Sequence, residues 1–234
     1  ENMGGDDEAR HASTADDWAT ARVRDLNTVA VECIAGADAR VLPQVPGLPD
    51  DAFVHDGQLT KRIVRAATVA ALAPLPGQTL WDLGAGCASV AIEWLRVAQD
   101  IQGQGAVAIA VERDAERCAM AAQNAARLGT PFLEIIHDET AQALTSLADP
   151  DAVFIGGGLS GGDDLVATVW DRLRPGGTLV ANVVTLEGER ALLNAHALYG
   201  GALTRIAISH ADPVGGLTGW RPAMPVTQWC AVKP

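Results

Sequence analysis

A glycine-rich turn carries the strongest chemical signal in the sequence. An apolar run ends near an acidic residue and passes through small residues into a helical pattern, in the order Asp82, Leu83, Gly84, Ala85, Gly86, Cys87, Ala88 and Ser89. Glycine permits positive φ angles and lets the backbone approach a ligand where a Cβ atom would collide. The N–H groups at the start of the following helix would point at whatever lies in the turn. This spacing predicts a cradle for a nucleotide cofactor.

An acidic residue stands where the ribose of such a cofactor would lie. The apolar run of residues 106–111 ends in Glu112, and an acid at the end of a second strand can accept hydrogen bonds from ribose hydroxyls. A dinucleotide fingerprint counted from Gly84 would have glycine or alanine where this chain has Ser89. With Asp82 two residues before the first glycine, the string instead resembles motif I of the class I S-adenosylmethionine methyltransferases. An NAD-binding module and a plain strand-to-helix turn remain as alternatives, because a lone glycine fingerprint is weak.

The elements that must position this turn predict an α/β fold. From Thr79 onward, apolar runs of strand length alternate with helical patterns, which is typical of a parallel sheet with helices on both faces. Near the end, a helix over 187–199 precedes strands over 203–209 and 225–232, which would pair antiparallel around a loop over 211–224. We therefore predict a seven-stranded, mostly parallel, Rossmann-like sheet with an antiparallel C-terminal hairpin. That ending resembles the class I methyltransferase fold.

Residues that follow the other strands would share one rim of the sheet with the turn, since parallel strands present ligands at their carboxyl ends. The candidates are Glu112, Arg113, His137, Asp138, Glu139, Thr140, Gly156, Gly157 and Gly158. Five glycines in the run 156–162 favour close approach of the backbone to a ligand, with a mobile loop as the alternative. Asp138 or Glu139 could simply cap the next helix, and His137 suits a rim position better than a catalytic one.

Composition limits the classes of function. The 234 residues carry a net charge of −12, which argues against non-specific binding to nucleic acid. The sequence contains no run of 18 apolar residues, so we expect no membrane-spanning helix. The four cysteines lack the spacing of a metal site, so we expect no metal and a reduced, cytoplasmic compartment.

Four stretches together resemble the decarboxylating precorrin methyltransferases of corrin (vitamin B12) biosynthesis. They are residues 49–53, 57–62, 82–87 and 154–158, within a similarity that runs from about Gly47 to Val232. The resemblance implies S-adenosylmethionine-dependent methylation of the macrocycle at carbon 15, coupled to loss of CO2 from the acetate side chain on ring C. A class I methyltransferase acting on another small molecule or on RNA is the main alternative, and a non-catalytic partner domain is another.

The leading residues suggest a second part of a larger enzyme. Residues 1–5 and 25–32 resemble the tail of a tetrapyrrole-methylase domain, which precedes this domain in bifunctional members of the family and would methylate carbon 5. We therefore expect residues 1–45 to be a tail or linker from that domain and residues 46–234 to form the class I methyltransferase domain. The resemblance also suggests a homo-tetramer, with residues 42–49 or the antiparallel sheet edge as candidate contacts.

The resemblance also implies the site residues. The cofactor set is Gly57, Thr60, Asp82, Gly84, Ala85, Gly86, Cys87, Ser89, Glu112, Arg113, Glu139, Thr140, Gly156 and Gly157. In this arrangement a helix over 57–73 would close over the pocket.

Cations would meet the carboxylates of the tetrapyrrole despite the acidic charge of the whole chain. The expected substrate set is Lys61, Arg62, Arg65, Gly158 and Arg221, with plain helix-surface charges as the alternative for Arg62 and Arg65. His55 could donate a proton, although a histidine without that role is the simpler interpretation, and no catalytic residue is assigned. Ala88 stands where members of the family commonly carry glycine, and a positive φ there would cost about 1 kcal/mol.

Overall fold

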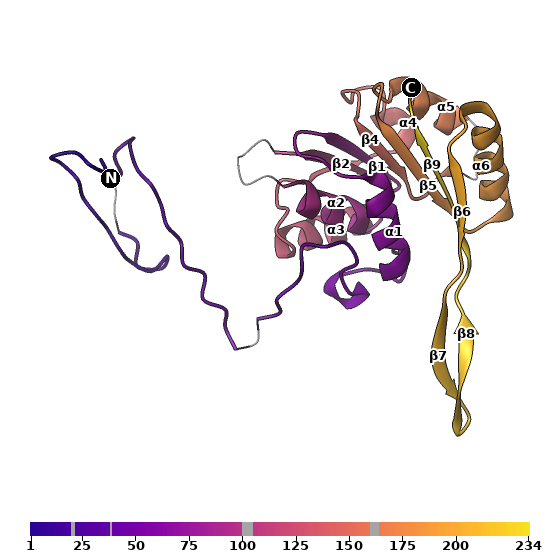
Figure 1. The fold of residues 1–234 in the computed structure, drawn as a ribbon, viewed down its shortest axis with the longest axis horizontal. Helices are drawn as coiled ribbons and strands as arrows, with labels where there is room; N and C mark the ends of the chain where they lie inside the picture. The colour runs from indigo at the N-terminus through magenta and orange to yellow at the C-terminus, as the bar shows by residue number, and fades with distance from the viewer. Residues whose placement is uncertain (20–21, 38, 100–104, 160–163) are drawn as a thin grey trace. The chain divides into compact units, whose positions relative to one another are not determined.

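A seven-stranded sheet organises the larger part of the computed structural model (Figure 1). The strands lie in the order β3 (Glu134–His137), β2 (Val107–Glu112), β1 (Thr79–Leu83), β4 (Ala152–Ile155), β5 (Thr178–Val183), β9 (Val226–Val232) and β6 (Ala202–Ile206). The first five strands along the chain pair in parallel, and β9 pairs antiparallel with both β5 and β6. This arrangement confirms the predicted mostly parallel sheet with an antiparallel end.

The structure describes residues 1–19, 22–37, 39–99, 105–159 and 164–234. They separate into two compact units, Glu1–Val41 and Leu42–Pro234. None of the described helices combines the length and the apolar content that a membrane crossing requires.

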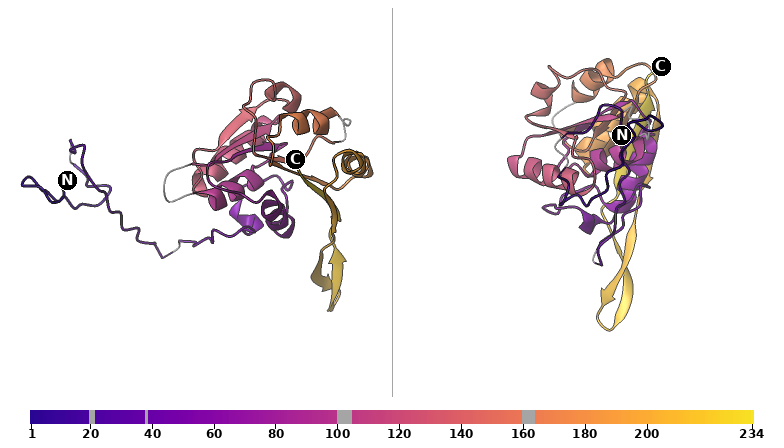
Figure 2. Two further views of the ribbon diagram at one scale, coloured as in Figure 1. Left: turned by 45° about the horizontal axis from the view of Figure 1, so that its top comes forward. Right: turned by 90° about the vertical axis from the view of Figure 1, so that its left-hand side faces the viewer.

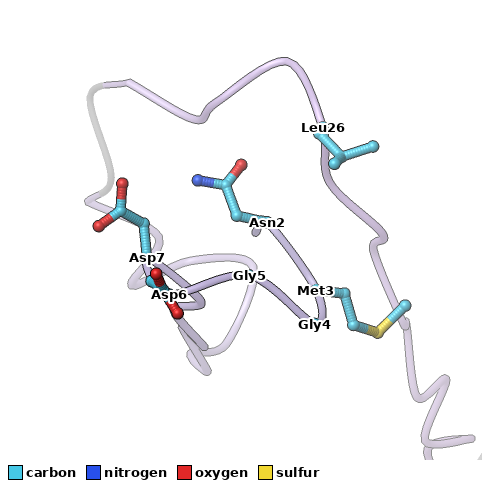
Figure 3. A pocket seen from close by; sticks show the side chains of 7 residues that line it. All are labelled: Asn2, Met3, Gly4, Gly5, Asp6, Asp7 and Leu26. Atoms are coloured by element: carbon cyan, nitrogen blue, oxygen red, sulfur yellow. The ribbon is translucent and has the colours of Figure 1, made fainter.

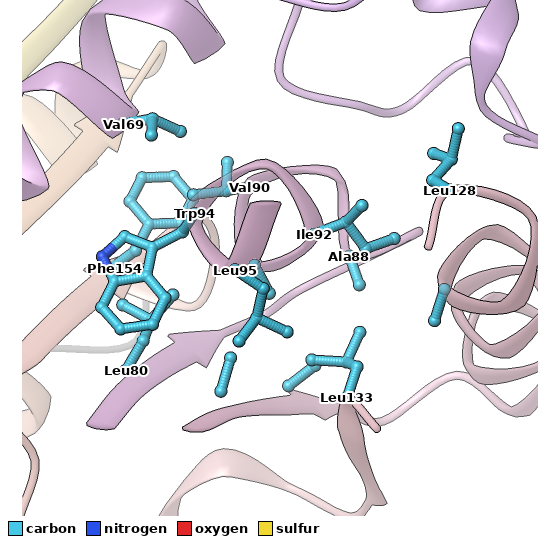
Figure 4. Packing of buried hydrophobic residues seen from close by; sticks show 14 of the residues in the cluster. Val69, Leu80, Ala88, Val90, Ile92, Trp94, Leu95, Leu128, Leu133 and Phe154 are labelled. Atoms are coloured by element: carbon cyan, nitrogen blue, oxygen red, sulfur yellow. The ribbon is translucent and has the colours of Figure 1, made fainter. Parts of the chain in front are cut away.

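Helices cover both faces of the sheet, as Figure 2 shows from two further directions. They are α1 (Arg62–Leu72), α2 (Ser89–Ala98), α3 (Ala115–Arg127), α4 (Thr140–Ala143), α5 (Asp164–Arg172) and α6 (Leu186–Tyr199), with a short 3-10 turn, η1 (Asp50–Ala52). Neighbouring residues of a strand point to opposite faces, so Leu80 and Trp81 belong to separate core clusters. The cluster around Leu80 packs against α1, α2 and α3 and includes Trp94 and Leu95 (Figure 4).

The segment that was predicted to be a loop forms a second hairpin. Strands β7 (Ser209–Val214) and β8 (Leu217–Pro222) make a separate two-stranded antiparallel sheet that leads away from the main sheet (Figure 1). The predicted loop over 211–224 is therefore wrong. Proline and glycine suggested a loop, but a two-stranded ribbon tolerates Pro213 and Pro222 because each strand has an unpaired edge, and Gly215, with φ +60°, forms the turn.

The smaller unit is described by itself. Its described residues form neither a helix nor a strand, and backbone hydrogen bonds, such as the one from the Asn2 N–H to the Leu26 carbonyl at 2.9 Å, connect its segments. An open hollow in this unit is lined by Asn2, Met3, Gly4, Gly5, Asp6, Asp7 and Leu26 (Figure 3). None of the predicted site residues lines this hollow.

Candidate functional site

The glycine turn after β1 and the glycine loop after β4 meet at the carboxyl rim of the sheet. The Gly84 N–H donates to the Val111 carbonyl at 3.0 Å, and the Gly156 N–H donates to the Leu83 carbonyl at the same distance. A Cβ atom placed on Gly84 would lie only 3.1 Å from the Gly157 nitrogen, and Gly84 has φ +70°. The two loops are therefore in backbone contact at a position where no side chain fits without a shift. Residues 160–162 of the predicted glycine run lie outside the described residues.

A third segment, residues 47–61, passes beside the turn, and we call it the strap. A Cβ atom on Gly86 would lie 3.6 Å from the carbonyl oxygen of Gln58 in the strap. The helix that was expected to start near Gly57 begins only at Arg62, because Gly57 adopts φ +99°, a left-handed conformation that a helix does not contain. The predicted cofactor residues Gly57 and Thr60 thus lie in the strap, before the first residue of α1, rather than in a helix.

Glu112 lies directly against the glycine turn. Its side chain is buried, and its two carboxylate oxygens accept hydrogen bonds from the Gly86 N–H at 2.8 Å and the Asp114 N–H at 3.0 Å. A carboxylate oxygen can accept more than one hydrogen bond, so these contacts orient Glu112 and still leave acceptor capacity for a hydroxyl.

Asp82 is a buried acid with an incomplete set of partners. One carboxylate oxygen accepts a hydrogen bond from the Ala91 N–H at 3.0 Å, and the other has no hydrogen-bond partner among the described residues. Burial raises the pKa of Asp82 to about 7, and the nearby charge of Glu112 also raises it. An unpaired buried oxygen beside a glycine cradle fits a ligand that carries an N–H or O–H donor.

Ala88 has the conformation that glycine would adopt more easily. Its φ is +58° and its ψ is 29°, it precedes the first residue of α2, and its side chain is fully buried. Ala88 therefore has the positive φ that costs an alanine about 1 kcal/mol. Ser89 and Cys87 beside it are also buried.

The remaining predicted cofactor residues lie at the ends of β2 and β3. The exposed side chains of Arg113 and Glu139 form an ion pair at 3.8 Å, and Thr140 is the first residue of α4. His137 lies close to them, with its Nε2 3.0 Å from the Arg113 carbonyl oxygen.

Two predicted substrate cations, Lys61 and Arg62, lie at the start of α1. The exposed Lys61 ammonium donates to the Gly57 carbonyl at 3.3 Å, and the Arg62 Nε donates to the Gly47 carbonyl at 2.8 Å. Gly158 has φ +88° and lies in the loop after β4. His55 is engaged within the strap, where its Nδ1 accepts a hydrogen bond from the Gly57 N–H at 2.9 Å.

Arg65 corrects the prediction that it is available to a substrate. Its side chain is fully buried, where its Nε donates to Glu93 at 2.6 Å and its guanidinium donates to Asp50 at 3.1 Å. The same guanidinium donates to the carbonyls of Leu48 and Thr60. The sequence pattern placed Arg65 on a helix surface, but the strap folds over that face of α1 and covers it.

Arg221 lies on β8 rather than in a loop. It is opposite His210 of β7, and its exposed guanidinium is 3.3 Å from the Asp212 carboxylate. It is thus carried by the projecting hairpin, which leaves the sheet after β6 and returns at the start of β9, beside the carboxyl end of β5.

Sequence reasoning missed two buried polar residues, Glu93 and Asn124, and the half-buried Asn182. Glu93 lies on α2 and pairs with Arg65, Asn124 lies on α3 and binds the strap, and Asn182 of β5 donates to Thr68 of α1 at 2.7 Å. Glu93 and Asn124 interrupt otherwise apolar, buried helix faces, and a polar residue in such a position was the available signal. Their hydrogen-bond partners, however, depend on the path of the strap.

Comparison with known proteins agrees with this geometry. The profile of the precorrin methyltransferase domain matches residues 51–233. Over 233 residues the chain is 45% identical to a decarboxylating precorrin-6Y C(5,15)-methyltransferase from a Sinorhizobium species, covering all of this chain and 55% of that protein. The chain therefore spans about half the length of the curated relatives that it matches.

Solved structures give the same result. The crystal structure of the C-terminal domain of precorrin-6Y C5,15-methyltransferase from Rhodobacter capsulatus is 42% identical, with a TM-score of 0.75 over 82% of this chain and 100% of that chain. A SAM-dependent O-methyltransferase from Thermotoga maritima, 16% identical with a TM-score of 0.59 over 76% of this chain and 68% of that chain, is similar in fold alone. The fold is that of the class I methyltransferases, and the chain belongs to the precorrin methyltransferase domain family.

Proposed function

We propose that this chain methylates a precorrin at carbon 15 with S-adenosylmethionine and removes CO2 from the acetate side chain on ring C, in cobalamin biosynthesis. The observation that carries the proposal is the meeting of the Gly84 turn, Glu112 and the Gly156–Gly157 loop at one rim, in a chain of this family. The Sinorhizobium relative is named a decarboxylating precorrin-6Y C(5,15)-methyltransferase, and we assign the carbon-15 part of that activity to this chain.

The residues at the rim fit S-adenosylmethionine. The cradle that a Cβ atom on Gly84 would fill, and the unpaired oxygen of Asp82, are features that a nucleoside with an amino-acid tail can use. We place the cofactor across Gly84–Cys87, with its ribose on Glu112 and its adenine near residues 138–140. The residues proposed to hold it are Gly57, Thr60, Asp82, Gly84, Ala85, Gly86, Cys87, Ser89, Glu112, Arg113, Glu139, Thr140, Gly156 and Gly157.

The chemistry asks the protein mainly for alignment and exclusion of water. S-adenosylmethionine supplies a methyl group on a sulfonium, and holding an acceptor carbon in line with it provides most of the acceleration. The conjugated macrocycle can take up the electron pair that loss of CO2 releases. The loops around Gly156 and the strap would orient the acetate and shield the site. His55 of the strap could donate one proton, but a histidine without that role is the simpler interpretation, so no catalytic residue is assigned.

Exposed cations near the rim would meet the carboxylates of a precorrin. Lys61 and Arg62 are exposed at the start of α1, and Arg221 is exposed on the hairpin, so each can reach an external anion. Gly158 would border the macrocycle. Arg65 is not in the proposed set, because its guanidinium is buried and is hydrogen-bonded to Glu93, Asp50, Leu48 and Thr60.

The proposal extends to a preceding domain and to the oligomeric state. We propose that residues 1–45 are the tail of a tetrapyrrole-methylase domain that methylates carbon 5, and that residues 46–234 form the carbon-15 domain. By resemblance we also propose a homo-tetramer with contacts from residues 42–49 or the antiparallel sheet edge. Exposed apolar side chains on the β7–β8 hairpin, among them Leu217 and Trp220, support self-association in general. The described cysteines are all unpaired, which suits the cytoplasm.

Turnover with a defined substrate tests the proposal. The chain is incubated with S-adenosylmethionine and a precorrin that retains the ring C acetate, and products are followed by mass. We expect one product that has gained one methyl group and lost one CO2. Methyl transfer to RNA, or to another small molecule with the precorrin left unchanged, would favour the alternative class I methyltransferase.

A further inference from the structure

Asn124 of α3 joins the strap to the glycine turn. Its side chain is fully buried. Its Oδ1 accepts a hydrogen bond from the Val54 N–H at 2.7 Å, and its Nδ2 donates to the Val54 carbonyl at 2.9 Å and to the Cys87 carbonyl at 3.2 Å. One amide side chain therefore contacts both backbone groups of a strap residue and one backbone group of the turn.

An amide is suited to this position because it carries two N–H donors and an acceptor in one plane. Both donors are used here, one toward the strap and one toward the turn. Asp, Ser or Leu at position 124 could not make all three contacts. The geometry at Asn124 therefore depends on the amide group itself and not only on the size of the side chain.

The contact lies close to where the strap passes the cradle. Four residues after Val54, the Gln58 carbonyl lies beside Gly86, at 3.6 Å from the position of an added Cβ atom. A second link from the same helix, between Arg117 and Asp56 at 2.8 Å, holds the outer side of the strap at a more exposed position. The ends of the strap are held separately, through the contacts of Arg65 with the carbonyls of Leu48 and Thr60.

We propose that Asn124 is a positioning residue for cofactor binding: it sets the separation between the strap and the glycine turn, and thereby the affinity for S-adenosylmethionine. The inference rests on the proposed function, because it takes the turn to be the cofactor cradle. Asn124 itself touches no reacting atom. It acts through Val54 on one side and Cys87 on the other.

Substitution of Asn124 tests this role with binding rather than activity as the first readout. Asn124→Ala removes all three contacts, and we expect S-adenosylhomocysteine to bind about tenfold more weakly by calorimetry, because binding must then fix the strap against the turn. In turnover, KM for S-adenosylmethionine should rise by about the same factor while kcat changes less. Asn124→Asp keeps the acceptor for the Val54 N–H and loses both donors, so it should also bind weakly.

A matched control separates positioning from stability. Leu128 is buried at the C-terminal end of the same helix and makes none of the contacts with the strap described above. Leu128→Ala should lower the unfolding free energy at least as much as Asn124→Ala, yet bind S-adenosylhomocysteine within about twofold of the wild type. Equal weakening of binding by both variants would overturn the positioning role.

Hydrogen exchange of the unmodified chain supplies a test that does not depend on the folding of a variant. The Val54 amide should exchange slowly in the free chain and more slowly still with S-adenosylhomocysteine. Unchanged Val54 exchange on binding, or wild-type affinity in folded Asn124→Ala, would overturn the inference and leave the proposed function standing. Failure of the wild-type chain to bind S-adenosylhomocysteine would overturn the proposed function, and this inference with it.

Discussion

Two buried carboxylates on opposite sides of the glycine turn have different surroundings. Glu93, which anchors the strap, accepts hydrogen bonds from Arg65 at 2.6 Å and from the Gly47 and Leu48 N–H groups at 2.6 and 2.9 Å. Asp82, which precedes the turn, has one backbone donor and one oxygen without a partner among the described residues. Both side chains are about 1% exposed, so burial alone does not distinguish them.

The difference indicates which acid serves the fold and which is open to a ligand. A buried charge with all its partners supplied by the protein holds segments together, because removing any partner leaves an uncompensated charge. A buried acid with a missing partner and a raised pKa is typical of a binding or catalytic site. The protein thus supplies the hydrogen-bond donors of Glu93 itself, whereas Asp82 beside the turn lacks a donor that a ligand could supply.

The largest expected effect is on stability, at the buried Arg65–Glu93 ion pair that anchors the strap. Arg65→Ala would leave Glu93 buried without a cation, and breaking a buried ion pair from one side costs about 3 to 5 kcal/mol of unfolding free energy. Urea unfolding measures this loss. Arg62→Ala is the control, because that side chain is exposed and its hydrogen bond to Gly47 contributes about 1 kcal/mol. A loss for Arg65→Ala no greater than for Arg62→Ala would contradict the anchor role.

The next largest effect is a pH dependence of the unfolding free energy, caused by Asp82 beside the turn. The pKa of Asp82 is about 7 in the folded chain against an ordinary value of 3.8, so between these values the folded state binds a proton that the unfolded state lacks. Stability contributed by protonated Asp82 should therefore be full below about pH 4 and fall by about 2 to 4 kcal/mol as the pH rises to about 7.

Asp82→Asn isolates that contribution. Asparagine cannot ionise, so the variant should lack this component of the pH dependence when urea unfolding is repeated across the same range. If the difference in stability between wild type and variant stays constant from about pH 4 to about pH 7, Asp82 does not titrate as the structure indicates.

Backbone contact at the turn predicts a loss of binding. Gly84→Ala places a Cβ atom about 3 Å from the Gly157 backbone and requires φ +70°, so S-adenosylhomocysteine should bind at least about tenfold more weakly. Gly77→Ala has a similar φ of +76° but open space around the added atom, and its binding should match the wild type. Equal binding by both variants would mean that contact between the two loops does not matter.

The smallest effect is a gain. Ala88→Gly relieves a positive φ beside the cradle and should tighten S-adenosylhomocysteine by up to about fivefold, since the strain amounts to about 1 kcal/mol. Ala73→Gly, at φ +46° on the exposed end of α1, relieves similar strain away from the turn and should leave affinity unchanged. Calorimetry of both variants makes the comparison, and unaltered affinity in Ala88→Gly would show that strain at position 88 does not reach the site.

The parts of the site built from backbone were predictable from the sequence, and the parts built from long side chains were not. Glycines at 84 and 86 indicate a local backbone geometry, and alternating apolar runs indicate where the strands end, so the residues at the rim followed from local pattern. The order of the strands was not predicted. The position of Arg65 depends on a strap that folds back over α1, which no local pattern encodes. The β7–β8 hairpin was missed because its prolines and glycines are common to loops and to exposed ribbons.

Titration tests most directly whether the Gly84 turn binds S-adenosylmethionine. The chain is titrated by calorimetry with S-adenosylhomocysteine, and separately with NAD. We expect micromolar binding of S-adenosylhomocysteine at one site per chain and no binding of NAD. Binding of NAD, or of neither compound, would contradict the claim.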